Sequence, residues 1–561
     1  MPAVIECVPN FSEGRDPEVI RRITARIESV DGATLLHVDP GKATNRTVVT
    51  FAGPPEAVVE AAFRGIAEAA ELIDMRRHTG EHPRMGATDV CPLIPISGIS
   101  MEETAEHARR LAERVGRELG LAVYLYEAAQ PDPARRNLAV VRAGEYEGLA
   151  RKLADPAWQP DFGPATFNAR SGATVIGARD FLVAYNVNLN TTSTRRANAV
   201  AFDVREAGRP KREGHPLTGK VVTDASGQPV MQPGTLKAVK AIGWFIPEYG
   251  VAQVSMNLTD LRVTPLHVAF DEVCRVAEAR GLRVTGSELV GLVPLAALLD
   301  AGRHFLRKQQ RSLGVSEQEL VRLAITSMGL DELAPFVPEQ RIIEYRLRDT
   351  GLSRLVDMSV RGFADETASE SAAPGGGSVA ALVGAFAASL GAMVANLSAH
   401  KRGWDERWEE FSRRAERGQQ LKDELLRLVD ADTRAFDRVM AALALPKASA
   451  AEKAARAAEL ERANLGAMEV PWQVMQVAFA TFELLEAMAR QGNPASASDA
   501  GVGALCARAA IRGAWLNVLT NASGIKDRGT VERILTEGRA LEAAAAEREA
   551  ELLAIVQSKF A

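Results

Sequence analysis

The densest group of reactive side chains lies in one short polar stretch, residues 78–89. Two histidines, His78 and His82, stand four residues apart, with Glu81 between them and Arg84 close behind. A loop can bring imidazole, carboxylate and guanidinium groups around one small substrate. Because histidine exchanges a proton readily near neutral pH, this stretch suits general acid–base chemistry.

The same histidines would share one face of a regular helix, where they could bind a metal. Gly80 and Pro83 disfavour such a helix, and the chain has no HExxH pattern, so no metal site is expected. A polar loop with incidental histidines is an alternative that composition alone leaves open.

A second candidate lies between two expected strands, in residues 37–46. It offers an acid, Asp39, and a guanidinium, Arg46, that could hold a substrate carboxylate through paired hydrogen bonds. A surface ion pair would use the same arginine, so both interpretations of Arg46 remain open.

Two strands further along are expected to share an uncharged polar face. Side chains alternate between the two faces of a strand, which places amides and hydroxyls on one side. Amides both donate and accept hydrogen bonds and could bind a flat polar heterocycle, although a solvated sheet face is the alternative. The residues are Asn186, Asn188 and Asn190 in 181–190, and Gln253, Ser255, Asn257 and Thr259 in 251–259.

Asp432 is the strongest single candidate for a catalytic residue in the C-terminal part. It falls near the middle of an apolar helical stripe that includes Leu421 and Leu428, whereas Asp430 lies on the opposite side and should be solvated. Burial raises the pKa of an acid and suits it to proton transfer. A structural acid that caps a neighbouring helix or pairs with an arginine is the alternative. Asp499 is expected to be a helix cap.

The glycine-rich run 373–378 precedes a helix expected in the uncharged segment 371–400. A glycine-rich helix start exposes backbone N–H groups and favours anions, with a simple turn as the alternative; the GK[ST] ending of a nucleotide-binding loop is missing. The uncharged segment could span a bilayer by length, but its alanine, glycine and serine indicate a helix buried in a closely packed bundle.

The elements that position these residues change character near residue 350. Before it, expected strands and helices follow the split βαβ order, β-α-β-β-α-β, and a second such series follows. After it, the chain is rich in alanine, with four prolines between long periodic stretches, which predicts helices. We therefore predict a multi-domain chain with two α/β, ferredoxin-like subdomains (1–180 and 181–346), a linker (347–356) and an all-α helical bundle (357–561), with 208–232 as a mobile excursion.

The composition bounds the class of protein. The chain has 561 residues, of which 47% are hydrophobic and 25% charged, as in soluble globular proteins of several domains. A net charge of −5 gives no cationic field for nucleic acid or anionic membranes. The four cysteines form no CxxC pair and no secretory leader is visible, so we expect a cytoplasmic protein.

Several separate motifs, in register along essentially the whole chain, resemble formiminotransferase-cyclodeaminase. Residues 208–232 are longer than expected from the animal members of that family. The motifs are ECVPNFSEG at 6–14, TNRT at 44–47, GEHPRMG at 80–86, RIIEY at 341–345, APGGGS at 373–378, VDAD at 429–432 and LNVL at 516–519.

The resemblance implies two activities of histidine breakdown. A transferase moves the formimino group from N-formimino-L-glutamate to N5 of tetrahydrofolate, and a cyclodeaminase closes the product to 5,10-methenyltetrahydrofolate with release of ammonia. It implies that His82 is catalytic in the first reaction and Asp432 in the second. The family's folate contacts correspond to Gly163, Pro164, Ala165, Thr166, Phe167, Asn168, Ala169, Arg170, Ser171, Gly172, Gly234, Thr235 and Leu236.

The chemistry suggests further roles. Asp39 and Glu81 could orient His82 or hold the cationic amidine, Arg46 the glutamate carboxylate, and Asn188 the folate. No metal or tightly bound cofactor is expected; the expected co-substrate is tetrahydrofolate in its polyglutamylated form. Its tail could bind a basic group, with a solvated basic surface as the alternative. A homo-oligomer through the helical part is expected, without nucleic acid or membrane partners. The basic residues are Arg195, Arg196, Arg209, Lys211 and Arg212.

Two other functions remain open from the sequence. A related one-carbon enzyme would transfer formyl in place of formimino, or act as a cyclohydrolase, since oxygen and NH differ by one hydrogen-bond donor. A non-catalytic folate-binding assembly protein would use neither His82 nor Asp432.

Overall fold

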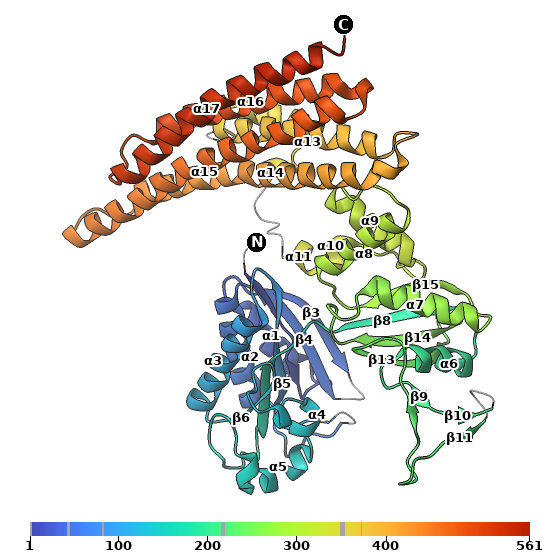
Figure 1. The fold of residues 1–561 in the computed structure, drawn as a ribbon. Coiled ribbons are helices and arrows are strands. Elements are labelled where there is room, and N and C mark those ends of the chain that lie inside the picture. The colour runs from blue at the N-terminus through green and yellow to red at the C-terminus, as the bar shows by residue number, and fades with distance from the viewer. Residues whose placement is uncertain are drawn as a thin grey trace. The chain divides into compact units, whose positions relative to one another are not determined.

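The protein divides into two compact units. The structure, a computed structural model, describes residues 3–41, 45–80, 83–214, 219–347, 354–371 and 373–560. One unit comprises residues 1–301 and 324–349, and the other comprises 302–323 and 350–561. The described sheets belong to the first unit and the second is helical (Figure 1), which confirms the predicted class of α/β followed by all-α.

The first sheet contains the predicted split βαβ order. Its elements are β1 (Val4–Cys7), β2 (Asn10–Phe11), α1 (Pro17–Glu28), β3 (Thr34–Gly41), β4 (Arg46–Gly53), α2 (Pro55–Leu72), β5 (Thr88–Ser97), α3 (Met101–Glu118), β6 (Ala122–Glu127), η1 (Pro133–Arg135), α4 (Leu138–Val141), α5 (Glu145–Ala154), η2 (Pro156–Trp158) and β7 (Ala173–Ala178). Four strands pair antiparallel in the order β5-β1-β4-β3, and β2 continues β1 between the same neighbours. β7 and β6 extend the β5 edge in parallel; the sequence analysis did not predict them.

The helices α1, α2 and α3 cover one face of this sheet. α1 begins at Pro17, because the Asp16 side chain accepts hydrogen bonds from two backbone N–H groups and proline suits the first helical position. Ile23 and Ile27 of α1 are buried against the sheet, with Phe11 and Phe51 in the same core. Catalytic side chains are therefore left to the opposite face and to the loops.

The second sheet repeats the split βαβ order. Its elements are β8 (Val183–Leu189), α6 (Thr194–Val204), β13 (Val239–Ile246), β14 (Val251–Leu258), α7 (Leu266–Ala279) and β15 (Val284–Val290). All pairs are antiparallel in the order β15-β8-β14-β13. The described part of the predicted excursion forms two short ladders, β9 (Arg209–Pro210) with β12 (Met231–Gln232) and β10 (Arg212–Glu213) with β11 (Lys220–Val221).

The helical unit packs α13 among three long helices. Small residues permit this: Gly418 lies so close to α13 that a Cβ there would stand 2.7 Å from Ala392 Cβ. Among the described helices, α13 and residues 494–521 are long and apolar enough to cross a membrane, yet 61% of the α13 window is buried, as the small residues predict. The elements are η3 (Leu355–Asp357), α12 (Val360–Thr367), α13 (Gly376–Ala399), η4 (Asp405–Arg407), α14 (Trp408–Ala444), α15 (Ala450–Gln491), η5 (Pro494–Ser496), α16 (Ala497–Asn521) and α17 (Arg528–Gln557).

Residues 302–323 join the helical unit although they precede it in sequence. The Gly314 carbonyl accepts hydrogen bonds from Asn396 Nδ2 at 2.8 Å and Gln419 Nε2 at 3.0 Å. The predicted domain boundaries stay a prediction, and residues 348–353 of the predicted linker lie outside the described residues. The connecting helices are α8 (Leu295–Lys308), α9 (Glu317–Met328), α10 (Pro338–Arg341) and α11 (Ile343–Arg346).

Candidate active sites

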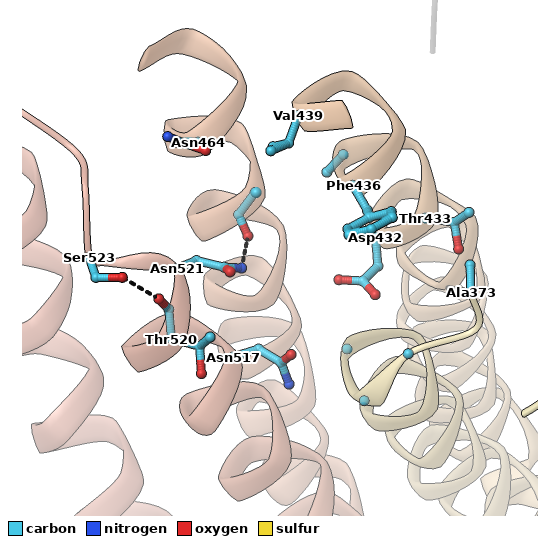
Figure 2. Close-up of a pocket in the computed structure, with 15 residues that line it drawn as sticks. Ala373, Asp432, Thr433, Phe436, Val439, Asn464, Asn517, Thr520, Asn521 and Ser523 are labelled. Carbon is cyan, nitrogen blue, oxygen red and sulfur yellow. Dashed lines mark hydrogen bonds between the residues drawn. The ribbon is translucent and has the colours of Figure 1, made fainter. Parts of the chain in front are cut away.

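A polar cavity of about 300 Å³ opens at the N-terminal end of α13. Asp432 enters it from α14, and Asn517, Thr520 and Asn521 face it from α16 (Figure 2). Because the walls come from four helices, the cavity is part of the bundle rather than of a surface loop. The lining residues are Ala373, Gly375, Gly376, Gly377, Asp432, Thr433, Ala435, Phe436, Val439, Asn464, Ala467, Asn517, Thr520, Asn521 and Ser523.

The Asp432 carboxyl is largely buried and is held by Ser378. Burial raises its pKa, although hydrogen bonds from the Ser378 hydroxyl and backbone N–H oppose that shift. The hydroxyl donates to Oδ2 at 3.0 Å. A carboxyl with a raised pKa that stays anchored on one side can accept a proton from a substrate and return it.

Gly377 leaves room for this carboxyl. A Cβ at Gly377 would collide with Asp432 Oδ1 and stand 2.6 Å from Asp432 Cγ. The cap residue of α13, Gly375, has no side chain that could accept hydrogen bonds from the first helical N–H groups. The anion expected at this helix start is therefore the protein's own Asp432, and the helix dipole favours its charged form.

Two predictions about neighbouring acids were wrong. Asp430 is not solvated: it is 9% exposed, and its Oδ1 accepts the Leu355 N–H at 2.9 Å, because η3 packs against that side of α14. Asp499 is not a cap, because α16 begins at Ala497 after Ser496 and Asp499 lies within the first turn. The apolar stripe predicts the buried side of α14 well only as far as Leu428, since Phe436 is 42% exposed.

Hydrogen bonds hold the predicted transferase loop before and after Glu81 and His82. These two residues themselves lie outside the described residues. Arg84 Nε donates to His78 Nδ1 at 3.2 Å, so the other ring nitrogen, Nε2, donates to the Asn45 carbonyl at 2.8 Å. Burial, with the nearby Arg84 charge, lowers the pKa of His78. His78 is thus a neutral bridge in the fold.

Asn45 connects three segments of this region, a role that the sequence analysis missed. Its backbone has a positive φ of 46°, its Oδ1 accepts the Gly14 N–H at 3.0 Å, and its Nδ2 donates to the Thr79 carbonyl at 3.0 Å. Its place in the TNRT motif was the only signal available, because the partners are 31 and 34 residues away.

Arg46 lines a cavity of about 640 Å³ that also contains Arg142, Arg179 and Lys240. Three acids, Glu127, Asp180 and Asp260, complete its charged wall. Burial lowers the pKa of Arg46, which still leaves a guanidinium charged at neutral pH. The cavity can therefore hold a carboxylate beside Arg46.

The same region contains a buried acid, Asp89. Its Oδ2 accepts from Arg142 at 2.7 Å, and its Oδ1 accepts the Met85 N–H at 3.0 Å. Burial raises the pKa of Asp89 to about 6, against the attraction of Arg142. Asp89 anchors the segment that follows the predicted catalytic histidine.

Asp39 and Arg46 lie on neighbouring strands, β3 and β4, but line different cavities. Asp39 is exposed and lines a cavity of about 990 Å³ with His37 and Thr50. Asp39 lies opposite Val48 in the β3–β4 register, two residues from Arg46. The structure therefore brings the two predicted residues near each other without placing them in one pocket.

The predicted folate loop 163–172 returns to the segment after His82. Gly172 has a positive φ of 68°, and a Cβ there would collide with the Met85 carbonyl. The Ala87 N–H donates to the Ser171 carbonyl at 2.8 Å. The first half of the loop, 163–167, is exposed, so a ligand could reach it.

The predicted amide face exists, but it is closed at Asn188. Asn188 lies opposite Gln253 and is 0% exposed. Its Oδ1 accepts from Gln253 Nε2 at 2.8 Å and its Nδ2 donates to Glu332 at 2.6 Å. The amides thus satisfy one another and an acid, whereas Asn190 and Asn257 at the ends of the strands are exposed.

The second predicted folate segment, 234–236, lies against α6. Thr235 donates its N–H to the Asp203 carbonyl at 2.9 Å and lines a cavity of about 370 Å³ with Arg209 and Arg280. Both arginines pair with the Asp203 carboxylate. Of the predicted basic group, Arg209 is therefore already neutralised.

The fold and these cavities define a protein of two chemically distinct parts, and family models describe both. Residues 4–179 match the formiminotransferase domain, N-terminal subdomain; 184–348 match the formiminotransferase domain; and 359–540 match formiminotransferase-cyclodeaminase. The chain belongs to the formimidoyltransferase-cyclodeaminase family.

Similar proteins cover the whole chain or one part of it. A formimidoyltransferase-cyclodeaminase of Mus musculus is 44% identical over 528 residues, 94% of each chain. A glutamate formimidoyltransferase of Streptococcus pyogenes is 39% identical over 55% of this chain and 94% of its own. A methenyltetrahydrofolate cyclohydrolase of Methylorubrum extorquens is 38% identical over 36% of this chain and 97% of its own.

Proposed function

We propose that this chain is a bifunctional folate enzyme of histidine degradation. It transfers the formimino group from N-formimino-L-glutamate to N5 of tetrahydrofolate, then cyclises 5-formiminotetrahydrofolate to 5,10-methenyltetrahydrofolate and releases ammonia. The observation that carries the proposal is the Asp432 carboxyl, seated at a helix start in a polar cavity. That cavity belongs to a chain whose bifunctional relative matches it over 94% of both lengths.

The ring closure needs one group that moves protons. N10 of the folate attacks the formimino carbon within the same molecule, so proximity supplies much of the rate. Asp432 accepts the N10 proton and delivers it to the nitrogen that leaves as ammonia. Its raised pKa favours both halves of this transfer.

The group transfer needs a base and a held substrate. His82 takes the proton from N5 and returns it to the departing glutamate nitrogen, with Glu81 and Asp39 as orienting acids or partners of the cationic amidine. Arg46 holds the glutamate carboxylate in its cavity. These roles rest on the family motifs and on the bonded segments around the loop.

Tetrahydrofolate is the co-substrate, and we propose that it is polyglutamylated. The loop 163–172, Asn188 and the segment 234–236 contribute to its site, Asn188 by holding the closed amide network in place. Because Arg209 is paired with Asp203, the polyglutamate tail of the folate would bind the remaining basic residues. These are Arg195, Arg196, Lys211 and Arg212.

We propose that the chain works in the cytoplasm and self-associates through its helical unit. Adjacent helices α13 and α16 each expose an apolar stripe, and exposed apolar area of this extent commonly binds another protein. A second copy is the proposed partner. Leu505→Glu should lower the mass of the assembly in solution, whereas Val360→Glu, on α12, should leave it unchanged. The exposed residues are Phe386, Met393, Leu397, Val502, Leu505, Leu516 and Leu519.

A cyclohydrolase is a second candidate for the helical part. The methenyltetrahydrofolate cyclohydrolase of Methylorubrum extorquens is similar to 201 residues of this chain, a length close to that of the helical part. Water would then add to the methenyl carbon, and no ammonia would form. A formyl-transferring enzyme would likewise act on N-formylglutamate.

One incubation tests the proposal. The full chain, given formiminoglutamate and tetrahydrofolate, should produce methenyl absorbance and ammonia in equal amounts over many turnovers. Product without ammonia, or activity only with N-formylglutamate, would favour the rival enzymes. Stoichiometric binding without turnover would leave a folate-binding protein.

A further inference from the structure

Asn517 stands beside Asp432 at the start of α13 and has no role in the reactions described so far. The two residues flank neighbouring glycines: a Cβ at Gly376 would lie 3.6 Å from Asn517 Nδ2, and a Cβ at Gly377 would lie 2.6 Å from Asp432 Cγ. Figure 2 shows both side chains pointing toward this helix start from different helices. A group that reacts with Asp432 is therefore within reach of the amide.

The amide is oriented by its own helix. Asn517 Nδ2 donates to the Gly513 carbonyl at 3.0 Å, one turn back along α16. One of the two Nδ2 hydrogens is held by the backbone, and Figure 2 shows the acceptor, Oδ1, on the Asp432 side of the cavity that Asn517 lines. An oriented acceptor distinguishes ligand groups that carry a hydrogen from those that do not.

Few other residues of the cavity could accept a hydrogen bond from a ligand group beside Asp432. Asp432 is the only ionisable side chain among the described residues that line it. Asn521, one turn beyond Asn517, uses its amide to join α16 to the Ala467 carbonyl of α15 at 2.7 Å. Asn517 is the amide that lies next to Gly376, at the start of α13.

We propose that Asn517 makes the helical site select formimino over formyl folate. This rests on the proposed function and adds the residue that sets its specificity. The formimino nitrogen carries hydrogens, and Asn517 Oδ1 accepts one of them. A formyl oxygen carries none, so two acceptors would face each other and the oxygen analogue is disfavoured.

The hydrogen bond also fits the chemical step. After N10 adds to the carbon, N10 gives its proton to Asp432. The exocyclic NH2 then takes that proton, the bond between carbon and this nitrogen breaks, and ammonia leaves with both bonding electrons. Asn517 Oδ1 orients the NH2 so that its lone pair faces Asp432.

The test compares two ligands in one variant. For Asn517→Leu, kcat/KM with supplied 5-formiminotetrahydrofolate should fall by about tenfold to a hundredfold, while the inhibition constant of 5-formyltetrahydrofolate changes by less than about threefold. The preference for formimino thus falls about tenfold or more. A ratio of the two constants within about twofold of the unmodified chain would overturn the proposal.

Two further variants separate specificity from damage. Asn521→Leu alters an equivalent amide in the same cavity and should leave the ratio unchanged; an equal change there would contradict a special role for Asn517. Asn517→Ser keeps a donor for the Gly513 carbonyl and an acceptor for the ligand, so it should retain the preference; a folded Asn517→Ser that loses the preference would contradict the proposal even if Asn517→Leu does not fold. If the unmodified chain released no ammonia, the proposed function itself would fail, a result distinct from an unchanged ratio.

Discussion

The two candidate sites differ in how much charge they use. The helical cavity has one ionisable residue, Asp432, among its described walls, and most of its lining comes from four helices. The cavity beside Arg46 has four cations and three acids, and the segments around it are joined by loops. Ring closure joins two ends of one bound molecule, whereas group transfer must hold two molecules together. The comparison teaches that the intramolecular reaction needs a proton carrier, and the bimolecular one needs charged anchors as well.

The largest expected effect is a loss of formimino transfer without a loss of cyclisation. His82→Ala should lower formimino transfer by about a hundredfold to ten-thousandfold, because the proton carrier is lost. Cyclisation of supplied 5-formiminotetrahydrofolate should stay within twofold. Both rates are measured on the same preparation, and an equal loss of the two would remove the division between the sites.

A substitution that adds one methyl group tests the helical side. Gly377→Ala should lower cyclisation by about a hundredfold, since the new Cβ would displace the Asp432 carboxyl and its Ser378 hydrogen bond. Gly376→Ala is the matched control. Its new Cβ would lie 3.6 Å from the nearest atom, Asn517 Nδ2, which is an ordinary contact. Similar losses in both variants would mean that the glycine run serves the helix rather than Asp432.

The charged anchors of the other cavity predict an effect on substrate binding. Arg46→Ala should raise the KM for formiminoglutamate by about tenfold or more, because a charge-assisted pair is lost, and should leave cyclisation unchanged. Arg21→Ala removes an exposed arginine of the same subdomain and should change neither constant. An unchanged KM in Arg46→Ala would place the carboxylate elsewhere.

The smallest effect concerns stability and a buried acid that neither reaction uses. Burial raises the pKa of Glu6 to about 8, against the attraction of Arg179. The folded state therefore holds a proton that the unfolded chain releases, so this contribution is complete below the ordinary pKa of 4.5 and is lost as pH rises toward 8. Urea unfolding should show Glu6→Gln flattening the pH dependence between these values, and the exposed Glu28→Gln should not.

The sequence predicts the fold where pattern and partners are local. The split βαβ order is confirmed in both sheets, and the two polar-faced strands expected in 181–190 and 251–259 correspond to β8 and β14. β6 and β7 were missed because both are buried almost throughout and paired in parallel, so they lack the alternation that marks a half-exposed strand. Cys7 and Cys91, whose sulfurs lie 3.4 Å apart, were likewise unpredictable from spacing, since only the pairing of β1 with β5 brings them together.

The sites follow the same rule. The apolar stripe of α14 identified Asp432 because its period belongs to one helix, but it misjudged Asp430, whose partner comes from η3. Asn45 and Asn517 acquire their roles from segments distant in the chain, so no local pattern predicts them. The catalytic assignments of His82 and Asp432 remain proposals that experiment must test.

The most direct measurement uses Asp432→Asn with formiminoglutamate and tetrahydrofolate. This variant should accumulate 5-formiminotetrahydrofolate and release glutamate at the unmodified rate, with ammonia formation reduced about a thousandfold. Adding the His82→Ala chain should then restore methenyl product and ammonia. If Asp432→Asn alone released ammonia at the unmodified rate, or if the mixture of the two variants stayed inactive while each chain kept its other activity, the assignment of one reaction to each site would be contradicted.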